Sequence, residues 1–347
     1  MDIKIEKLKN SEIEITGSIA FEDLNKHREQ AIKKVGAHLK IDGFREGKVP
    51  EKIIIEKIGE MAILNEMGEL ALQMAYPDII LGNKINPISS PQVSITKLAN
   101  DNPMEFKIKL TVMPEITLPD YKNIAKKEMA KKEDSVEVTE EELKQTIEQI
   151  RKSQKHVKKD GEKVTEKDLE KDKDELPELT DELVKKIGDF KDVADFKTKL
   201  KENIKHEKEH RAKEKKRMEI LNAIVKDSKI ELPELLVEAE LRKMLAEMND
   251  NISRMGLQFD KYLESIKKTE DDLKKEWRPD AETRVKSQLV LSKISTEEKI
   301  NPQEDEVQKN VDVIMAQYKD AKKENVDVYV RMMLTNEEVF KLLEDQK

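Results

Sequence analysis

The residue pattern closest to a catalytic site is HEKEH, formed by His206, Glu207 and His210 with two residues between them. Two histidines four residues apart on a helix can bind Zn²⁺, and a glutamate directly after the first can act as a general base, as in zinc metalloproteases. The surrounding sequence, KENIKHEKEHRAKEKKRM, is among the most hydrophilic in the chain and offers no apolar wall to exclude water. We therefore favour a solvated helix face, with adventitious metal binding as a weaker alternative, and predict no catalytic residue, no metal site and no cofactor.

A second candidate is the glycine-bounded segment GFREGKVP, which lies between two amphipathic helical stretches. Glycines allow a tight turn and close approach by a partner, an aromatic side chain can stack or fill a pocket, and basic side chains can meet phosphate or carboxylate. On composition alone, a plain interhelical turn with Phe44 in the core is an equally good interpretation. The candidate recognition residues are Gly43, Phe44, Arg45, Glu46, Gly47, Lys48 and Pro50.

This segment resembles the ribosome-docking signature of trigger factor, a family of bacterial chaperones that meet nascent chains at the ribosomal exit tunnel. Two later stretches are also similar to that family: ELPELTDELVKKIG at 175–188, and the run from Ala281 to Ile300. The resemblance implies that Phe44, Arg45 and position 46 contact a ribosomal protein and ribosomal RNA. The chain departs from the family at Glu46, where a basic residue is usual, and phosphate repels an acidic side chain.

One part of the family pattern is missing. Trigger factors usually carry a prolyl isomerase domain of the FK506-binding type before the segment similar to ELPELT, whereas here only the 18 residues 158–175, rich in charge and without an aromatic residue, take its place. Such a domain needs a β-sheet of roughly a hundred residues and an aromatic-lined pocket that desolvates the X-Pro amide. We therefore expect a member of the family that is not an enzyme.

Methionine supplies a third group of candidates. Unbranched, polarizable side chains adapt to many apolar shapes, which suits a surface that holds varied unfolded segments. For any single methionine, helix core is the better interpretation on spacing alone. As a group on a hydrophilic scaffold, the candidate client-binding residues are Met244, Met248, Met255, Met315, Met332 and Met333.

The composition indicates how the chain divides into domains. Charged residues number 33 among the first 112 residues but 107 among the remaining 235, and seven of the ten glycines lie before residue 83. This shift predicts a domain boundary near residue 112. Together with the resemblance, it implies a ribosome-binding domain at 1–112, a connector strand, helix and charged linker at 113–174, and a helical substrate-binding domain at 175–347 that packs with a connector helix at 139–157.

Hydrophobic periodicity gives the expected elements. Alternation around Ile3, Ile13, Val93 and Phe106 predicts half-buried strands, and helical spacing predicts helices over Phe21–Ile41 and from Pro50 to Met74. Thr139 with Glu142 forms a capping box that starts a helix. Later helices are predicted at 233–255, 273–277, 281–294, 307–318 and 328–343, and a long one, polar in its middle, after residue 192. The fold class is an α+β docking domain followed by an elongated all-α domain with helical arms.

The function we expect is an ATP-independent chaperone that binds the ribosome and shields nascent or unfolded polypeptides; no glycine-rich phosphate loop is present. A ribosome-independent helical holdase or adaptor is the alternative, and a prolyl isomerase is disfavoured. A net charge of −8 argues against nonspecific nucleic-acid binding, and no apolar stretch approaches a membrane span. The absence of cysteine and of a secretory signal predicts a cytoplasmic protein without membrane contact. A homodimer away from the ribosome is also compatible with this interpretation.

Overall fold

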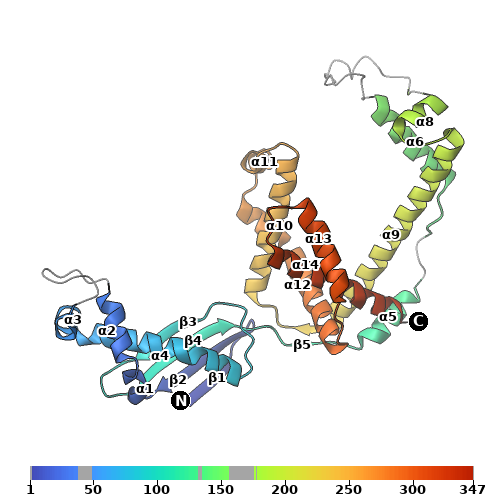
Figure 1. The fold of residues 1–347 in the computed structure, drawn as a ribbon. Coiled ribbons are helices and arrows are strands. Elements are labelled where there is room, and N and C mark those ends of the chain that lie inside the picture. Colours follow the sequence, from blue (N-terminus) through green and yellow to red (C-terminus); the bar gives the residue numbers. More distant parts are fainter. Residues whose placement is uncertain (1, 38–48, 132–134, 156–175, 177, 347) are drawn as a thin grey trace. The chain divides into compact units, whose positions relative to one another are not determined.

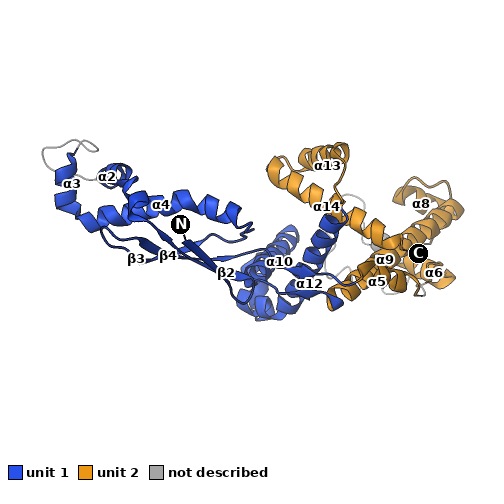
Figure 2. Cartoon of the chain, turned by 90° about the horizontal axis from the view of Figure 1, so that it is seen from below, with its two compact units in different colours: residues 1–119, 227–299 blue, residues 120–226, 300–347 orange. Residues whose placement is uncertain are grey.

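The chain forms two compact units, each assembled from segments that are far apart in sequence. The structure, a computed structural model, describes residues 2–37, 49–131, 135–155, 176 and 178–346. One unit contains residues 1–119 and 227–299, and the other contains residues 120–226 and 300–347 (Figure 2). Composition along the chain cannot reveal such a return of a later segment to an earlier one. The division into residues 1–112, 113–174 and 175–347 stays a prediction.

The first unit begins with a four-stranded antiparallel sheet in the order β1-β2-β4-β3 (Figure 1). Alternating apolar and polar residues produce this sheet, because successive side chains of a strand point to opposite faces. In β4 every second residue is buried, from Met104 to Leu110. The opposite face carries charged cross-strand pairs, including Lys107 with Glu14 at 2.9 Å and Lys109 with Glu12 at 2.8 Å. The strands are β1 (Asp2–Lys7), β2 (Glu12–Ile19), β3 (Gln92–Lys97) and β4 (Met104–Thr111), and the predicted strands are confirmed.

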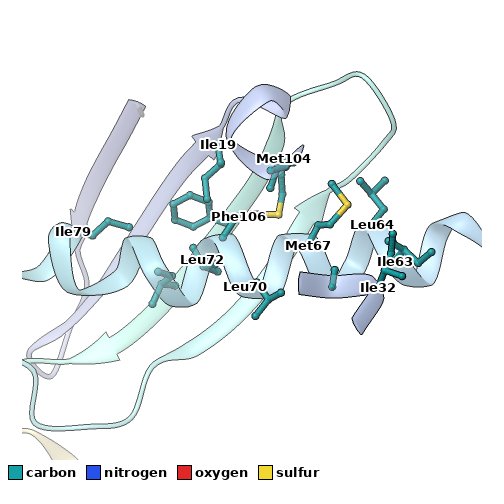
Figure 3. Close-up of a cluster of buried hydrophobic side chains, with 14 of the residues drawn as sticks. Ile19, Ile32, Ile63, Leu64, Met67, Leu70, Leu72, Ile79, Met104 and Phe106 are labelled. Atoms are coloured by element: carbon teal, nitrogen blue, oxygen red, sulfur yellow. The ribbon is translucent and has the colours of Figure 1, made fainter. Parts of the chain in front are cut away.

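Helix α4 packs on the apolar face of this sheet and contributes with it to a core of 19 buried apolar residues (Figure 3). The predicted helix from Phe21 is divided in two, and the predicted run from Pro50 is divided at Gly59, whose φ of +89° is not helical. The second part then continues past the predicted end, through Pro77. The helices are α1 (Phe21–Asn25), α2 (Arg28–Gly36), α3 (Glu51–Ile58) and α4 (Glu60–Gly82).

The same unit also contains three later helices. Strands β5 (Ile116–Thr117) and β6 (Lys229–Ile230) pair where the chain leaves this unit and where it returns. Helix α12 runs through Pro279, so the separate helices predicted at 273–277 and 281–294 are one element. A helix at 259–266 was not predicted, because its apolar residues form barely two turns. The three helices are α10 (Glu234–Arg254), α11 (Phe259–Ile266) and α12 (Glu270–Glu297).

The second unit is helical throughout its described residues. Its longest element is α9, with buried residues near both ends and charged residues between, as the sequence predicts. None of the helices described in the chain is long and apolar enough to cross a membrane. The helices of this unit are α5 (Tyr121–Met129), α6 (Glu140–Lys155), α8 (Asp181–Ile187), α9 (Val193–Asp227), α13 (Glu304–Gln317) and α14 (Lys323–Glu344).

Candidate functional site

Six of the seven candidate docking residues, Gly43 to Lys48, lie outside the described residues. The helices on either side of them, α2 and α3, are described. Helix α2 ends at Gly36, and α3 begins after Pro50, whose carbonyl accepts hydrogen bonds from the Ile53 and Ile54 amides at 3.0 and 3.1 Å. A β-carbon added at Gly36 would lie 2.5 Å from Ile54 Cδ1. The two helices therefore pack closely at the point where the loop leaves and returns.

Ion pairs fix this base to helix α4. Arg28 of α2 donates two hydrogen bonds to Glu60, and Lys34 Nζ lies 2.5 Å from Glu66 Oε1. The hydrogen bond from Arg28 holds the pKa of Glu60 below its usual value. Because α4 is packed on the sheet, the ends of the loop are held by the core of the first unit.

The six candidate methionines fall into two groups in the structure. Met244 is only 8% exposed and packs with Val237 and Leu241, while Met248 and Met315 are half-buried against other helix cores. Solvent reaches the side chains of the remaining three, of which Met255 is the most exposed at 75% and Met332 and Met333 are each 38% exposed. Met244 lies within α10, where neighbouring residues cover it, whereas Met255 is the C-cap residue that follows the last residue of this helix, and its side chain stays in solvent.

Helix α14 presents a row of apolar side chains to solvent that spacing alone did not single out. Val328 and Met332 are four residues apart, as are Tyr329 and Met333, so the four share one side of the helix. Val328 is 67% exposed and Tyr329 is 54% exposed. We call these four residues the α14 apolar stripe. On the same helix, Val326 and Val330 are buried in the core with α13. The sequence signal that was available is therefore a second row of apolar residues beside the buried row.

An arginine that is 8% exposed at its side chain connects α14 to the long helix α9. Arg217 donates to both carboxylate oxygens of Glu337 at 2.8 and 2.7 Å and to Glu344 at 2.5 Å, and it lies over the Phe340 ring at 5.1 Å from the centroid. Its hydrogen bonds to Glu337 and Glu344 raise the pKa of Arg217, and they lower the pKa of Glu337. The neighbouring Lys216 donates to the carbonyls at the end of α5.

A second arginine joins α14 to α13. Arg331 donates to both carboxylate oxygens of Glu304, at 2.8 and 2.5 Å, and its Nε donates to Asp327 at 2.6 Å. These hydrogen bonds raise the pKa of Arg331. Helix α14 is thus bound to α9 through Glu337 and to α13 through Arg331. These contacts hold the backbone that carries the α14 apolar stripe.

The HEKEH segment lies on a solvated part of α9, as favoured from the sequence. The His206 side chain is 78% exposed, and Glu207 pairs with Arg211 at 2.8 Å. Among the described residues, no three His, Asp or Glu side chains are grouped so that they could hold a metal ion.

The connector helix α6 is anchored at both its start and its apolar face. Thr139 and Glu142 form the predicted capping box, with backbone-to-side-chain distances of 2.8 and 3.2 Å. Leu143 and Ile147 pack with Val184 of α8 and Phe196 of α9. The predicted charged linker at 158–175 lies outside the described residues.

Two models of one protein family match the N-terminal and the C-terminal parts of the chain. The family model described as bacterial trigger factor protein matches residues 1–150, and the model of its C-terminus matches residues 192–346. A trigger factor of Halothermothrix orenii is 25% identical, over 96% of this chain and 94% of its own, and one of Staphylococcus epidermidis is 25% identical over 90% and 89%.

The fold comparison extends over the whole chain. A solved structure, described as showing promiscuous substrate recognition in folding and assembly activities of the trigger factor chaperone, covers 100% of both chains with a TM-score of 0.57 and 17% identity. The alignment with the H. orenii relative has 403 positions, so at least 56 of them have no counterpart among the 347 residues here. With the two family models covering most of its length, the chain belongs to the bacterial trigger factor family of ribosome-associated chaperones.

Proposed function

We propose that the chain is an ATP-independent chaperone that docks at the ribosomal exit tunnel and shields nascent or unfolded polypeptides on its helical surfaces. The observation that carries the holding role is the α14 apolar stripe, because large apolar side chains stay in water on a helix that ion pairs hold in place. Methionine and tyrosine side chains adapt to many apolar partners. Membership of the trigger factor family supports the same role.

Aggregation of an unfolded client tests the holding role. We expect replacement of Met332 and Met333 by glutamine to weaken the suppression of aggregation while helicity and melting temperature stay unchanged, since both side chains are already in solvent. A matched control replaces Met61 and Met74 by glutamine; these are 57% and 68% exposed but lie on α4. Equal loss of activity in both double variants would contradict a client surface on α14.

The docking role is assigned to Phe44, Arg45 and Glu46 by resemblance, and the fixed helices on either side of their loop support it. Replacing all three by alanine should abolish co-sedimentation with ribosomes and leave aggregation suppression intact. Glu46→Lys should tighten ribosome binding by about 1 kcal/mol if an RNA phosphate is nearby. Full co-sedimentation of the triple variant would remove the docking assignment and leave the holding role standing.

We further propose that the chain does not catalyse prolyl isomerisation. The 41 residues between the two family-model matches are fewer than the roughly 50 of a small domain, and they include α8, which packs on α6 and α9. Without a pocket that favours the twisted amide, the barrier of about 18–20 kcal/mol is unchanged. A protease-coupled peptide assay should therefore give the uncatalysed rate, and acceleration in proportion to protein concentration would refute this.

Three finer features belong to the same proposal. We assign docking to residues 1–112, connection to 113–174 and client binding mainly to 175–347, and we place the chaperone in the cytoplasm, where nascent chains emerge. Away from the ribosome it would form a homodimer, which sedimentation velocity over a range of concentrations tests directly. A single species of monomer mass throughout that range would contradict the dimer.

A further inference from the structure

The two edge strands of the sheet differ in how they are protected from pairing with other chains. Strand β1, DIKIEK, has four charged residues in six, and charge on an edge strand is a common defence against the addition of another strand. Strand β3, QVSITK, has a single charge at its last position. It belongs to residues 85–96, which form the longest stretch without Asp, Glu, Lys or Arg in a chain that is 40% charged.

The outer side of β3 is open. In the described part of the chain, β3 pairs only with β4, so its other backbone donors and acceptors face away from the sheet. Pro91 precedes the strand and a register shift occurs between Ile95 and Lys97, which leaves a short uninterrupted edge from Gln92 to Ile95. An edge of this kind can receive one extended segment through main-chain hydrogen bonds.

An apolar groove runs beside this edge. It has a volume of about 350 Å³, and its lining includes Leu72 and Tyr76 of α4 with Val93 and Ile95 of β3. Figure 3 shows Leu72 on α4 beside the sheet. Val93 pairs with the buried Ile108 and so lies on the face that α4 covers, yet Val93 is 48% exposed, so the helix covers this part of the strand incompletely. Side chains of an added strand on this face would enter the groove.

We propose that the β3 edge and this groove, the β3 site, hold an extended, uncharged segment of an unfolded polypeptide as an added strand. The assignment rests on the chaperone function proposed above and names a class of client segment for it. Segments of high β-propensity and low charge are those most prone to aggregate, and they match the uncharged edge and apolar groove. An acidic side chain would lose its hydration in the groove and would be repelled by Glu69, which also lines it.

The chemistry of the chain favours a client segment over a second copy as the occupant. Pairing of two β3 edges would bring together two molecules that each carry a net charge of −8, whereas an uncharged segment meets no such repulsion. The homodimer proposed above would therefore use a surface other than the β3 edge.

The probe for the β3 site is a fluorescent peptide of about ten residues that alternates valine with threonine or glutamine and carries no charge. Val93→Lys gives β3 the kind of charge that β1 already has, at an exposed position, and it should raise the Kd of the peptide at least about tenfold. The matched control is Ile5→Lys on β1, where the side chain is 37% exposed, and it should leave the Kd unchanged. A peptide with proline at alternate positions, which cannot donate the ladder hydrogen bonds, should bind neither variant nor the parent chain at the β3 site.

Hydrogen exchange identifies where the peptide binds. The amides of Gln92–Ile95 should gain protection on addition of the valine peptide, and those of β1 should not.

Equal affinity of the peptide for Val93→Lys and for the parent chain would overturn the proposal. A change in sedimentation mass with no change in peptide affinity would also overturn it, because it would assign β3 to self-association. The same preparations enter the aggregation assay: peptide binding without suppression would refute the chaperone function alone, and suppression without an effect of Val93→Lys on peptide affinity would refute the β3 site alone.

Discussion

The sheet with its covering helices and the helical remainder of the chain are packed in different ways. The first has one continuous cluster of 19 buried apolar residues, from Ile13 to Leu110. Four clusters in the helical remainder, at α6, α8 and α9, at α10 and α12, at α10 to α12 and at α13 and α14, have three or four buried residues each. Other buried apolar residues of α9, α12 and α14, such as Ile220, Ile294 and Val339, lie outside these four clusters. A helix pair has only one narrow contact face, so other apolar residues, such as Val328 and Tyr329, stay in solvent.

This difference suits the two proposed roles, because the sheet region can hold the docking loop rigidly and the helical remainder can bind clients of different shapes. The large core holds the base of the proposed docking loop, which requires a fixed geometry. The small cores are supplemented by charged contacts such as those of Arg217, and they leave apolar surface for clients. Local stability should therefore depend on one continuous apolar core in the sheet region, and on several apolar clusters together with ion pairs and helix caps in the helical remainder.

The largest effect is expected in the large core. Phe106 is 1% exposed and packs against α4, so Phe106→Ala should destabilise this region by about 3–5 kcal/mol. Native-state hydrogen exchange should show faster exchange in β2 and β4, with α9 unchanged. Uniform acceleration in α9 as well would mean that the two regions unfold together, and the comparison would fail.

A smaller but still large effect is expected at the charged contact of α9 with α14. Arg217→Met removes the cation that pairs Glu337 and Glu344 and should destabilise α14 by about 2–3 kcal/mol, because the two carboxylates lose their partner. The control is Arg278→Met, whose side chain is 41% exposed and pairs with Glu234; it should cost at most about 1 kcal/mol. Denaturant-dependent exchange of the α14 amides measures the first cost, and that of the α10 and α12 amides measures the second. Equal costs would show that burial of the arginine is not the deciding factor.

Helix caps should contribute less to stability than either the core residue Phe106 or the ion pairs of Arg217. Thr269 and Asp272 form a capping box at the start of α12, so Thr269→Ala should cost about 1 kcal/mol and fray the first turn. Thr283→Ala, on the exposed side of the same helix, should be neutral or slightly stabilising, since alanine has the higher helix propensity. Amide exchange at Leu273 compares the two variants. Similar exchange at Leu273 in both would exclude a role for the cap.

The smallest effect concerns pH and the connector helix. The hydrogen bond from Lys208, together with those from Thr139, lowers the pKa of Glu142 from 4.5 to about 2. A carboxyl whose pKa is lower in the folded state stabilises that state above the unfolded pKa, and the contribution is lost as the pH falls from about 4.5 towards 2. Glu142→Gln should flatten this part of the acid titration of α6, followed by amide exchange. A titration identical to that of the parent chain would contradict the assignment.

Many elements could be predicted because their signals are local. Strict alternation around Phe106 identifies a strand, Thr139 with Glu142 identifies a helix start, and a charged middle with apolar ends identifies the long helix α9. The glycine-bounded segment from Gly43 to Pro50 could be proposed as a docking site from the sequence only through its resemblance to a family signature, and that assignment stays a prediction.

Only the tertiary structure decided which apolar residues are core and which are surface. Met244 and Met255 have the same spacing pattern, yet neighbouring helices cover Met244 and leave Met255 in solvent. In the strand order β1-β2-β4-β3, the pairing of β2 with β4 joins residues up to 99 positions apart, and this order leaves β3 at an edge. The pairing of β5 with β6 joins residues more than a hundred positions apart. Propensity and periodicity act over one or two turns of chain, whereas burial depends on what the rest of the chain brings alongside.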